Sequence, residues 1–161
     1  PANVDDSEVL AGLIGTLSEI AENTPLLFPV HPRTRQTLAE LIDPNGRIDL
    51  CEPLGYLDFL GLMSQAQVML TDSGGIQEET TVLGVPCITL RENTERPITV
   101  TEGTNQVVGR DRTTILAALE RVRNGEIPPR RPELWDGHAG ERIAQVLLAT
   151  HQSPLRRPTD L

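Results

Sequence analysis

Apolar residues follow two patterns along this chain. In one they form short runs, which are typical of strands buried on both faces in a parallel sheet. In the other they recur every three or four positions, which is typical of a helix with one buried face. The predicted strands are Leu26–Val30, Ile48–Cys51, Val68–Leu70 and Cys87–Leu90. The predicted helices are one with apolar positions from Val9 to Ile20, then Thr34–Ile42, Tyr56–Ala66, Ile76–Leu83, Thr113–Asn124 and His138–Thr150.

Strands and helices alternate, which predicts an α/β fold: an open parallel sheet with helices on both faces, a Rossmann-like domain. The first predicted element is a helix, capped by residues 3–7, and we expect a strand before it near the centre of the sheet. That first strand is missing from this sequence. We predict a polar loop for Arg91–Thr104. Residues 1–150 then form one domain, and 151–161, with two prolines and little apolar content, form a disordered tail.

The composition limits the classes of molecule that this chain is expected to bind. The chain has 161 residues and a net charge of −9, which argues against nucleic acid as a partner but allows one bound nucleotide. It has no signal peptide and no apolar run near the roughly 18 residues that a membrane helix needs, so we predict no membrane partner and a cytoplasmic location. Cys51 and Cys87 lie in or beside apolar runs and are predicted to be reduced thiols. No metal-ligand spacing is present, and we expect neither a metal nor a cofactor.

Candidate chemistry lies in the turn after the strand Val68–Leu70. Ser73 is followed by Gly74-Gly75, and we interpret the glycines as allowing a sharp turn into the next helix. A helix that begins there presents unpaired N–H groups and the positive end of its dipole to an anion. Ser73 adds a hydroxyl donor, and Glu79, one turn further on, can accept hydrogen bonds from a ribose. The turn therefore suits a nucleotide diphosphate.

A purely structural interpretation is also open. Ser73, Gly74 and Gly75 can form a tight turn without any ligand, and Glu78 and Glu79 can be solvated. Neither the Walker A motif nor Gly-x-Gly-x-x-Gly occurs here, so the common ATP and dinucleotide fingerprints do not apply.

A longer pattern surrounds this turn. It comprises Asp72-Ser73-Gly74-Gly75-Ile76-Gln77-Glu78-Glu79, then Leu83-Gly84-Val85-Pro86, then Thr94-Glu95-Arg96-Pro97. In this order and spacing it resembles the signature of the non-hydrolysing UDP-N-acetylglucosamine 2-epimerases. Asn3-Val4-Asp5-Asp6, the turn and short strand within Gly103–Gly109, and Asp136–Ile143 match further elements, so the resemblance extends from Asn3 to about residue 148.

The resemblance implies the C-terminal half of a two-domain enzyme of the GT-B type. Such enzymes, in polysaccharide biosynthesis, interconvert UDP-N-acetylglucosamine and UDP-N-acetylmannosamine by elimination and re-addition of UDP. Their acid–base carboxylates lie mainly in the N-terminal domain. The implied partners of this chain are therefore UDP, a UDP-N-acetylhexosamine and that N-terminal domain, and no catalytic residue is assigned. The chain alone is expected to be inactive.

The resemblance also suggests ligand-binding roles outside the glycine turn. Arg96 matches an arginine near the nucleotide sugar, with a salt bridge to Glu92 or Glu95 as the structural alternative. Phe59 matches a residue beside the uracil, with core packing as its alternative.

His31 matches a histidine that in some bacterial members is associated with a regulatory UDP-N-acetylglucosamine. The residues after it, Arg33-Thr34, depart from the family pattern. A hydrogen-bonded loop residue is the alternative for His31.

Three functional hypotheses remain open at this point. The first is the nucleotide-sugar-binding half of an epimerase. The second is the donor-binding half of a GT-B glycosyltransferase, which Asp72-Ser73 before the glycines disfavours, because the related transferases usually have a histidine there. The third is a non-catalytic α/β domain. The oligomeric state is also open, a homo-oligomer being one alternative.

Overall fold

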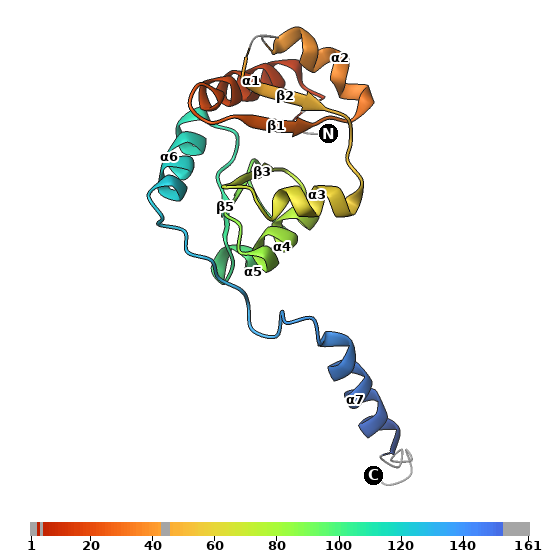
Figure 1. The fold of residues 1–161 in the computed structure, drawn as a ribbon. Helices are drawn as coiled ribbons and strands as arrows, with labels where there is room; N and C mark the ends of the chain where they lie inside the picture. The colour runs from red at the N-terminus through yellow and green to blue at the C-terminus, as the bar shows by residue number, and fades with distance from the viewer. Residues whose placement is uncertain (1–2, 4, 43–45, 153–161) are drawn as a thin grey trace.

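The computed structural model describes residues 3, 5–42 and 46–152. It contains five strands and seven helices, which alternate along the chain except that the last two helices follow each other (Figure 1). The strands are β1 (Leu26–Pro29), β2 (Ile48–Cys51), β3 (Met69–Thr71), β4 (Cys87–Thr89) and β5 (Asn105–Val107). The helices are α1 (Ser7–Ala21), α2 (Pro32–Leu41), α3 (Tyr56–Met63), α4 (Gly74–Leu83), α5 (Pro97–Thr101), α6 (Arg112–Arg123) and α7 (Ala139–Gln152).

The ends of these helices follow local sequence signals. The Asp6 carboxylate caps α1 by accepting hydrogen bonds from the N–H groups of Glu8 and Val9, at 2.9 and 3.2 Å. Gly84 ends α4 in the left-handed conformation, with φ of 74°. Both features confirm the predicted boundaries.

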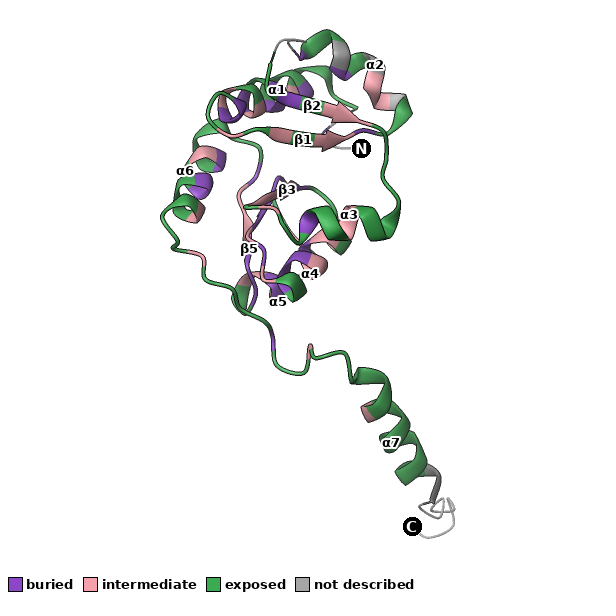
Figure 2. Cartoon of the chain, in the orientation of Figure 1, coloured by how far each residue is buried: buried purple, intermediate pink, exposed green. Residues whose placement is uncertain are grey.

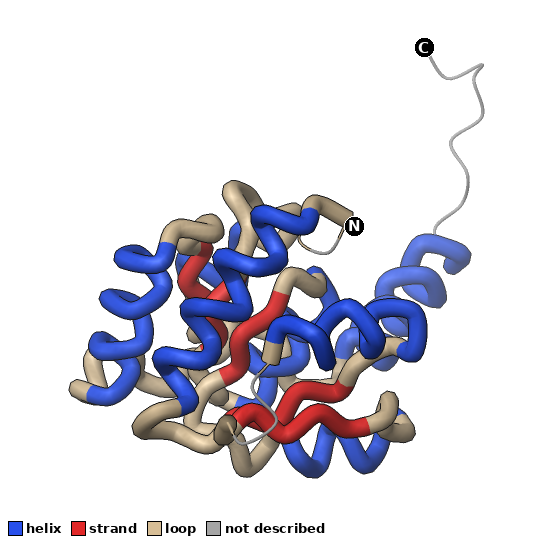
Figure 3. Tube along the Cα trace, turned by 90° about the horizontal axis from the view of Figure 1, so that it is seen from above, coloured by secondary structure: helices blue, strands red, loops and turns tan. Residues whose placement is uncertain are grey.

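All strand pairs are parallel, as predicted, but the strands form two sheets rather than one. One sheet has the order β1-β2 and the other β3-β4-β5. Leu26 is in register with Ile48 in the first sheet, and Met69 with Cys87 in the second. Cys87 is in turn in register with Asn105. The predicted class, parallel strands with helices on both faces, is confirmed (Figure 3).

The two faces of the second sheet differ in what covers them. On one face Ile88 of β4 packs with Leu13 and Ile20 of α1 and with residues of α6. On the other face Cys87 lies beside Thr80 of α4. Alternate residues of one strand therefore contact different helix layers, as expected for a doubly covered sheet.

Two further elements differ from the sequence interpretation. The polar loop predicted for 91–104 was wrong over Pro97–Thr101, which form helix α5. Pro97 has the fixed φ that suits a first helical position, but the four residues after it are β-branched and give no helical periodicity. Helix α7 runs to Gln152, two residues beyond the predicted domain end, and the rest of the predicted tail, 153–161, lies outside the described residues.

Helix α7 lies apart from the rest of the molecule (Figure 1). Nearly all of it is exposed (Figure 2), including four large apolar side chains: Ile143, Val146, Leu147 and Leu148. No helix in the described part of the chain is long and apolar enough to cross a membrane.

Candidate nucleotide site at the start of helix α4

The turn after β3 leaves the first N–H groups of α4 without a side-chain cap. Ser73 is the N-cap residue, yet its hydroxyl makes no capping hydrogen bond, and no acidic side chain lies in the first turn. The backbone N–H of Ser73 donates to the Thr71 hydroxyl at 3.0 Å, which fixes the turn from the strand side. An anion at this end of α4 would therefore meet free donors and a favourable dipole.

The glycine pair is not explained by the protein's own packing. A Cβ built on Gly74 would have no neighbour within 4 Å, and one on Gly75 would meet only the Ser73 hydroxyl, at 4.0 Å. Neither glycine is among the residues with positive φ. The interpretation that they permit a sharp turn was therefore wrong, since an alanine would fit the same backbone. What the glycines do leave is open space beside the N-terminus of α4.

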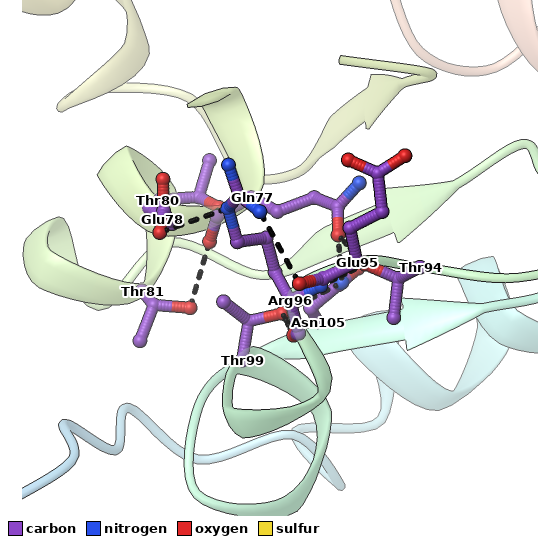
Figure 4. A network of polar contacts seen from close by, with 9 residues as sticks. All are labelled: Gln77, Glu78, Thr80, Thr81, Thr94, Glu95, Arg96, Thr99 and Asn105. Carbon is purple, nitrogen blue, oxygen red and sulfur yellow. Dashed lines mark hydrogen bonds and ion pairs between the residues drawn. The ribbon is translucent and has the colours of Figure 1, made fainter. Parts of the chain in front are cut away.

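A buried polar network holds α4 against the loop that follows β4 (Figure 4). Gln77, on α4, is fully buried, and its side-chain oxygen accepts from the Thr94 hydroxyl at 2.5 Å and from the Asn105 amide at 3.0 Å. The Thr94 hydroxyl in turn accepts from the backbone N–H of Arg96 at 2.9 Å. This network fixes the backbone of Arg96 relative to α4, and the sequence interpretation gave Gln77 no such role.

The Arg96 side chain is about 40% exposed, and its Nε lies 3.0 Å from the Glu78 carboxylate (Figure 4). Glu78 is thus the carboxylate that pairs with Arg96, in place of the predicted alternatives Glu92 and Glu95; Glu95 contributes its backbone oxygen, at 3.2 Å from Nη1. The interpretation of Glu78 as merely solvated does not hold. The ion pair brings the guanidinium to the same helix that begins with the glycine pair.

The remaining predicted residues lie on separate elements. Glu79 is half-buried on α4, and within the described part of the chain its carboxylate makes no hydrogen bond or ion pair. Phe59 is half-buried on α3, and His31 is exposed after β1, directly before α2. The structure therefore brings Ser73, Gly74, Gly75, Glu79 and Arg96 together around α4, and carries Phe59 and His31 on other helix–strand units.

Asn3 is a residue of this region that the sequence interpretation did not include. Its side chain is buried, and its amide donates to the backbone oxygen of Leu90 at 3.0 Å and to the Asp72 carboxylate at 3.5 Å. Asn3 thereby joins the segments that follow β3 and β4, directly beside Ser73. The available signal was its place in the Asn3-Val4-Asp5-Asp6 motif.

The fold and this turn define a doubly wound α/β domain with an open helix N-terminus at the carboxyl end of a parallel strand, an arrangement typical of nucleotide-binding domains. Comparison with known proteins narrows the class. The family model for UDP-N-acetylglucosamine 2-epimerase matches residues 1–148. The UDP-N-acetylglucosamine 2-epimerase of Methanocaldococcus jannaschii is 42% identical over 152 residues, which cover 90% of this chain and 41% of that protein.

A second relative acts on a different sugar. It is the UDP-2,3-diacetamido-2,3-dideoxy-D-glucuronate 2-epimerase of Pseudomonas aeruginosa, 35% identical over 146 residues that cover 90% of this chain and 41% of that protein. Among solved structures, the M. jannaschii epimerase in complex with UDP-GlcNAc and UDP superposes with a TM-score of 0.79 at 41% identity, over 92% of this chain and 42% of that one.

The chain belongs to the UDP-N-acetylglucosamine 2-epimerase family. It spans about 41% of the length of the curated relatives described here and corresponds to their C-terminal part. The predicted resemblance and the predicted Rossmann-like, GT-B-type fold are thereby confirmed.

Proposed function

We propose that this domain binds the UDP part of a UDP-N-acetylhexosamine, with the diphosphate at the N-terminus of α4. The observation that carries the proposal is the open, uncapped start of α4, where a Cβ on Gly74 would meet nothing within 4 Å. Phosphate oxygens can approach backbone N–H groups closely only where no side chain intervenes. Family membership and the UDP bound to the M. jannaschii enzyme support the same ligand.

Each residue around the turn has a defined part in this proposal. The Ser73 hydroxyl, which caps nothing in the chain, donates to a phosphate oxygen. The unpaired Glu79 carboxylate accepts from the ribose hydroxyls. Arg96, held by Glu78 through Nε, directs its remaining guanidinium donors to the diphosphate or the sugar. Phe59 packs beside the uracil, and His31 is the candidate for a regulatory contact.

For the whole protein we propose reversible 2-epimerisation of the nucleotide sugar. A base removes the proton at C2 while the C1–O bond to UDP breaks, giving a 2-acetamidoglucal and free UDP. UDP then adds back to C1 as C2 receives a proton on its opposite face. This domain holds the UDP throughout, and the acid–base groups lie in the part of the protein that precedes it. We further propose that the protein acts in the cytoplasm, in polysaccharide biosynthesis.

Titration of UDP against the chain, followed by calorimetry or NMR, tests the placement of the ligand. Ser73→Ala and Glu79→Ala should each weaken binding by about tenfold, since each removes one hydrogen bond to a charged or buried group. Glu133→Ala, at an exposed residue of the segment before α7, is the matched control and should leave the affinity unchanged. Equal affinity in all variants would place the nucleotide elsewhere.

Incubation with UDP-N-acetylglucosamine, followed by NMR of the sugar protons, tests whether the acid–base groups lie outside this domain. The chain alone should bind the nucleotide sugar and give no UDP-N-acetylmannosamine. Turnover at roughly 1 per second or faster would show that the acid–base groups reside in these residues. If the chain bound UDP but neither UDP-N-acetylglucosamine nor UDP-N-acetylmannosamine, the result would favour a sugar of the kind named for the P. aeruginosa relative.

A further inference from the structure

The ladder of hydrogen bonds between β3 and β4 departs from its regular pattern at its carboxyl end. Met69 donates its backbone N–H to the oxygen of Pro86 at 2.9 Å. At the end of β3, the Thr71 oxygen accepts from the N–H of Leu90 at 2.8 Å. A residue that faces the partner strand in a parallel ladder bonds to it through both its N–H and its C=O. The regular continuation is therefore a bond from the N–H of Ser73 to the oxygen of Leu90.

The structure has two other bonds in its place. The N–H of Ser73 turns back and donates to the Thr71 hydroxyl at 3.0 Å. The oxygen of Leu90 accepts from the side-chain amide of Asn3, also at 3.0 Å. The Asn3 side chain, on a residue that is only 8% exposed, thus takes the place of a backbone donor at the end of the sheet.

This exchange of donors allows the turn to leave the sheet. Leu90 is buried, and a buried backbone oxygen requires a donor. Because Asn3 supplies that donor, residues 72–75 can bend away from β4 and lead directly into α4. Without the Asn3 amide, the ladder donor for Leu90 is the N–H of Ser73, and its return to Leu90 would draw the turn back toward β4.

The same amide also lies near a charge that matters for an anion. Its nitrogen is 3.5 Å from the carboxylate of Asp72, the residue directly before Ser73. A carboxylate directed into the turn would repel a phosphate. The long contact with Asn3 favours the orientation in which the Asp72 carboxylate faces Asn3.

We propose that Asn3 is a positioning residue for the diphosphate. Its amide replaces the N–H of Ser73 as the donor to Leu90 and so keeps the turn at residues 72–75 open at the start of α4. Asn3 acts through the backbone of the turn and makes no contact with the ligand. This proposal rests on the proposed function, since it concerns the same nucleotide site.

The test compares two variants of Asn3 with a matched control in the full chain. Asn3→Leu keeps the approximate volume and removes the donor, and Asn3→Ala removes the donor but leaves room for a water molecule. Thr16→Val is the control, because Thr16 is 3% exposed and its hydroxyl bonds to Gly12 within α1, at 3.1 Å. Urea unfolding establishes that each variant is folded.

The first measurement needs no ligand. By NMR, hydrogen exchange of the Ser73 N–H should be slower in Asn3→Leu than in the unaltered chain, because this N–H returns to a buried acceptor. The change should be smaller in Asn3→Ala, where water can donate to Leu90, and absent in Thr16→Val. A turn that merely loosened would exchange faster. Faster or unchanged exchange of Ser73 in the folded Asn3 variants would overturn the proposal.

The second measurement is the affinity for UDP. Asn3→Leu should bind UDP about tenfold more weakly than the unaltered chain, and Thr16→Val should bind it equally well. Full affinity in Asn3→Leu, in a chain whose binding Gly75→Ala weakens, would overturn the proposal. If Gly75→Ala left UDP binding unchanged, the proposed function itself would fail. The exchange of Ser73 would then still decide whether Asn3 shapes the turn.

Discussion

The two sheets differ in how many polar side chains are buried beside them. Between the β1–β2 sheet and helices α1 and α2 lies an apolar cluster of buried residues: Leu10, Ile14, Ala21, Val30, Leu38, Ile42 and Ile48. Around α4, α5 and the β3–β4–β5 sheet, many of the most deeply buried side chains are polar: Gln77, Thr80, Thr81, Thr89, Thr99, Thr104 and Asn105. Two members of this cluster, Gln77 and Thr99, bond to the segment that carries Arg96, through Thr94 and the Arg96 backbone oxygen.

The difference shows which property of the protein depends on each of these two regions. An apolar core needs the right volume and tolerates swaps of similar size, whereas a buried polar network needs each partner at a defined distance and angle. Asn105 illustrates the second case, since its amide bonds both Gln77 and Thr99 at 3.0 Å and its oxygen accepts from Thr89 at 2.6 Å. The polar side therefore positions a loop, and the apolar side supplies stability.

The largest expected effect is on the apolar side. Leu38 of α2 is 1% exposed, so Leu38→Ala should lower the free energy of unfolding by about 2–5 kcal/mol through lost burial and a cavity. UDP affinity of the folded fraction should not change. Leu41→Ala, in the same helix but 41% exposed, is the control for urea unfolding. Equal losses in the two variants would show that the apolar cluster is not close-packed.

A smaller loss of stability is expected on the polar side, accompanied by a loss of binding. Gln77→Leu keeps the approximate volume but leaves the Thr94 hydroxyl without its acceptor and the Asn105 amide with only Thr99, which should cost about 1–3 kcal/mol. Because Thr94 holds the Arg96 backbone, UDP affinity should also fall. Urea unfolding and UDP titration are compared with Gln65→Leu, at an exposed position. Unchanged UDP affinity in Gln77→Leu would contradict a positioning role for the network.

The third prediction concerns how the free energy of unfolding changes with pH. Burial raises the pKa of the Cys87 thiol from 9.0 to about 11, although hydrogen bonds from Thr80 and Thr89 lower it. The unfolded chain therefore loses this proton first, and stability that is fully present below pH 9 should fall as pH rises to about 11. The loss should be about 2 kcal/mol. The free energy of unfolding, measured at pH 8 and 10.5, should show that Cys87→Ala removes this part of the pH dependence and that Cys51→Ala does not. The same pH dependence in both variants would contradict the prediction.

Much of the fold was predictable because its signals are local. A few neighbouring residues are enough to signal a short apolar strand, the Asp6 cap and the end of α4 at Gly84. The structure has each of these features. Helix α5 was not predictable in this way. Its buried Thr99 hydroxyl donates to the Arg96 oxygen within the same segment and accepts from Asn105 of β5, a contact with another element that the local sequence does not signal.

The candidate site likewise has some residues that the sequence pattern predicted and others that it did not. The glycine turn and Arg96 stood out as a spaced pattern, and the structure places both on or against α4. The roles of Gln77 and Asn3 depend on partners up to 87 positions away in the sequence, as with Asn3 and Leu90. Nothing in the pattern alone distinguishes a buried glutamine from the solvated side chains expected on a helix.

The central claim is that the open start of α4 receives the diphosphate, and a pair of glycine substitutions tests it most directly. Gly75→Ala and Gly12→Ala each add a methyl group with no protein atom closer than 4.0 Å, so both variants should fold, and Gly12→Ala should gain about 0.5–1 kcal/mol. In UDP titrations Gly75→Ala should bind at least about tenfold more weakly, because the methyl group takes the space of a phosphate oxygen beside the N–H groups. Gly12→Ala should bind as the unaltered chain does. Full UDP affinity in a folded Gly75→Ala protein would contradict the account.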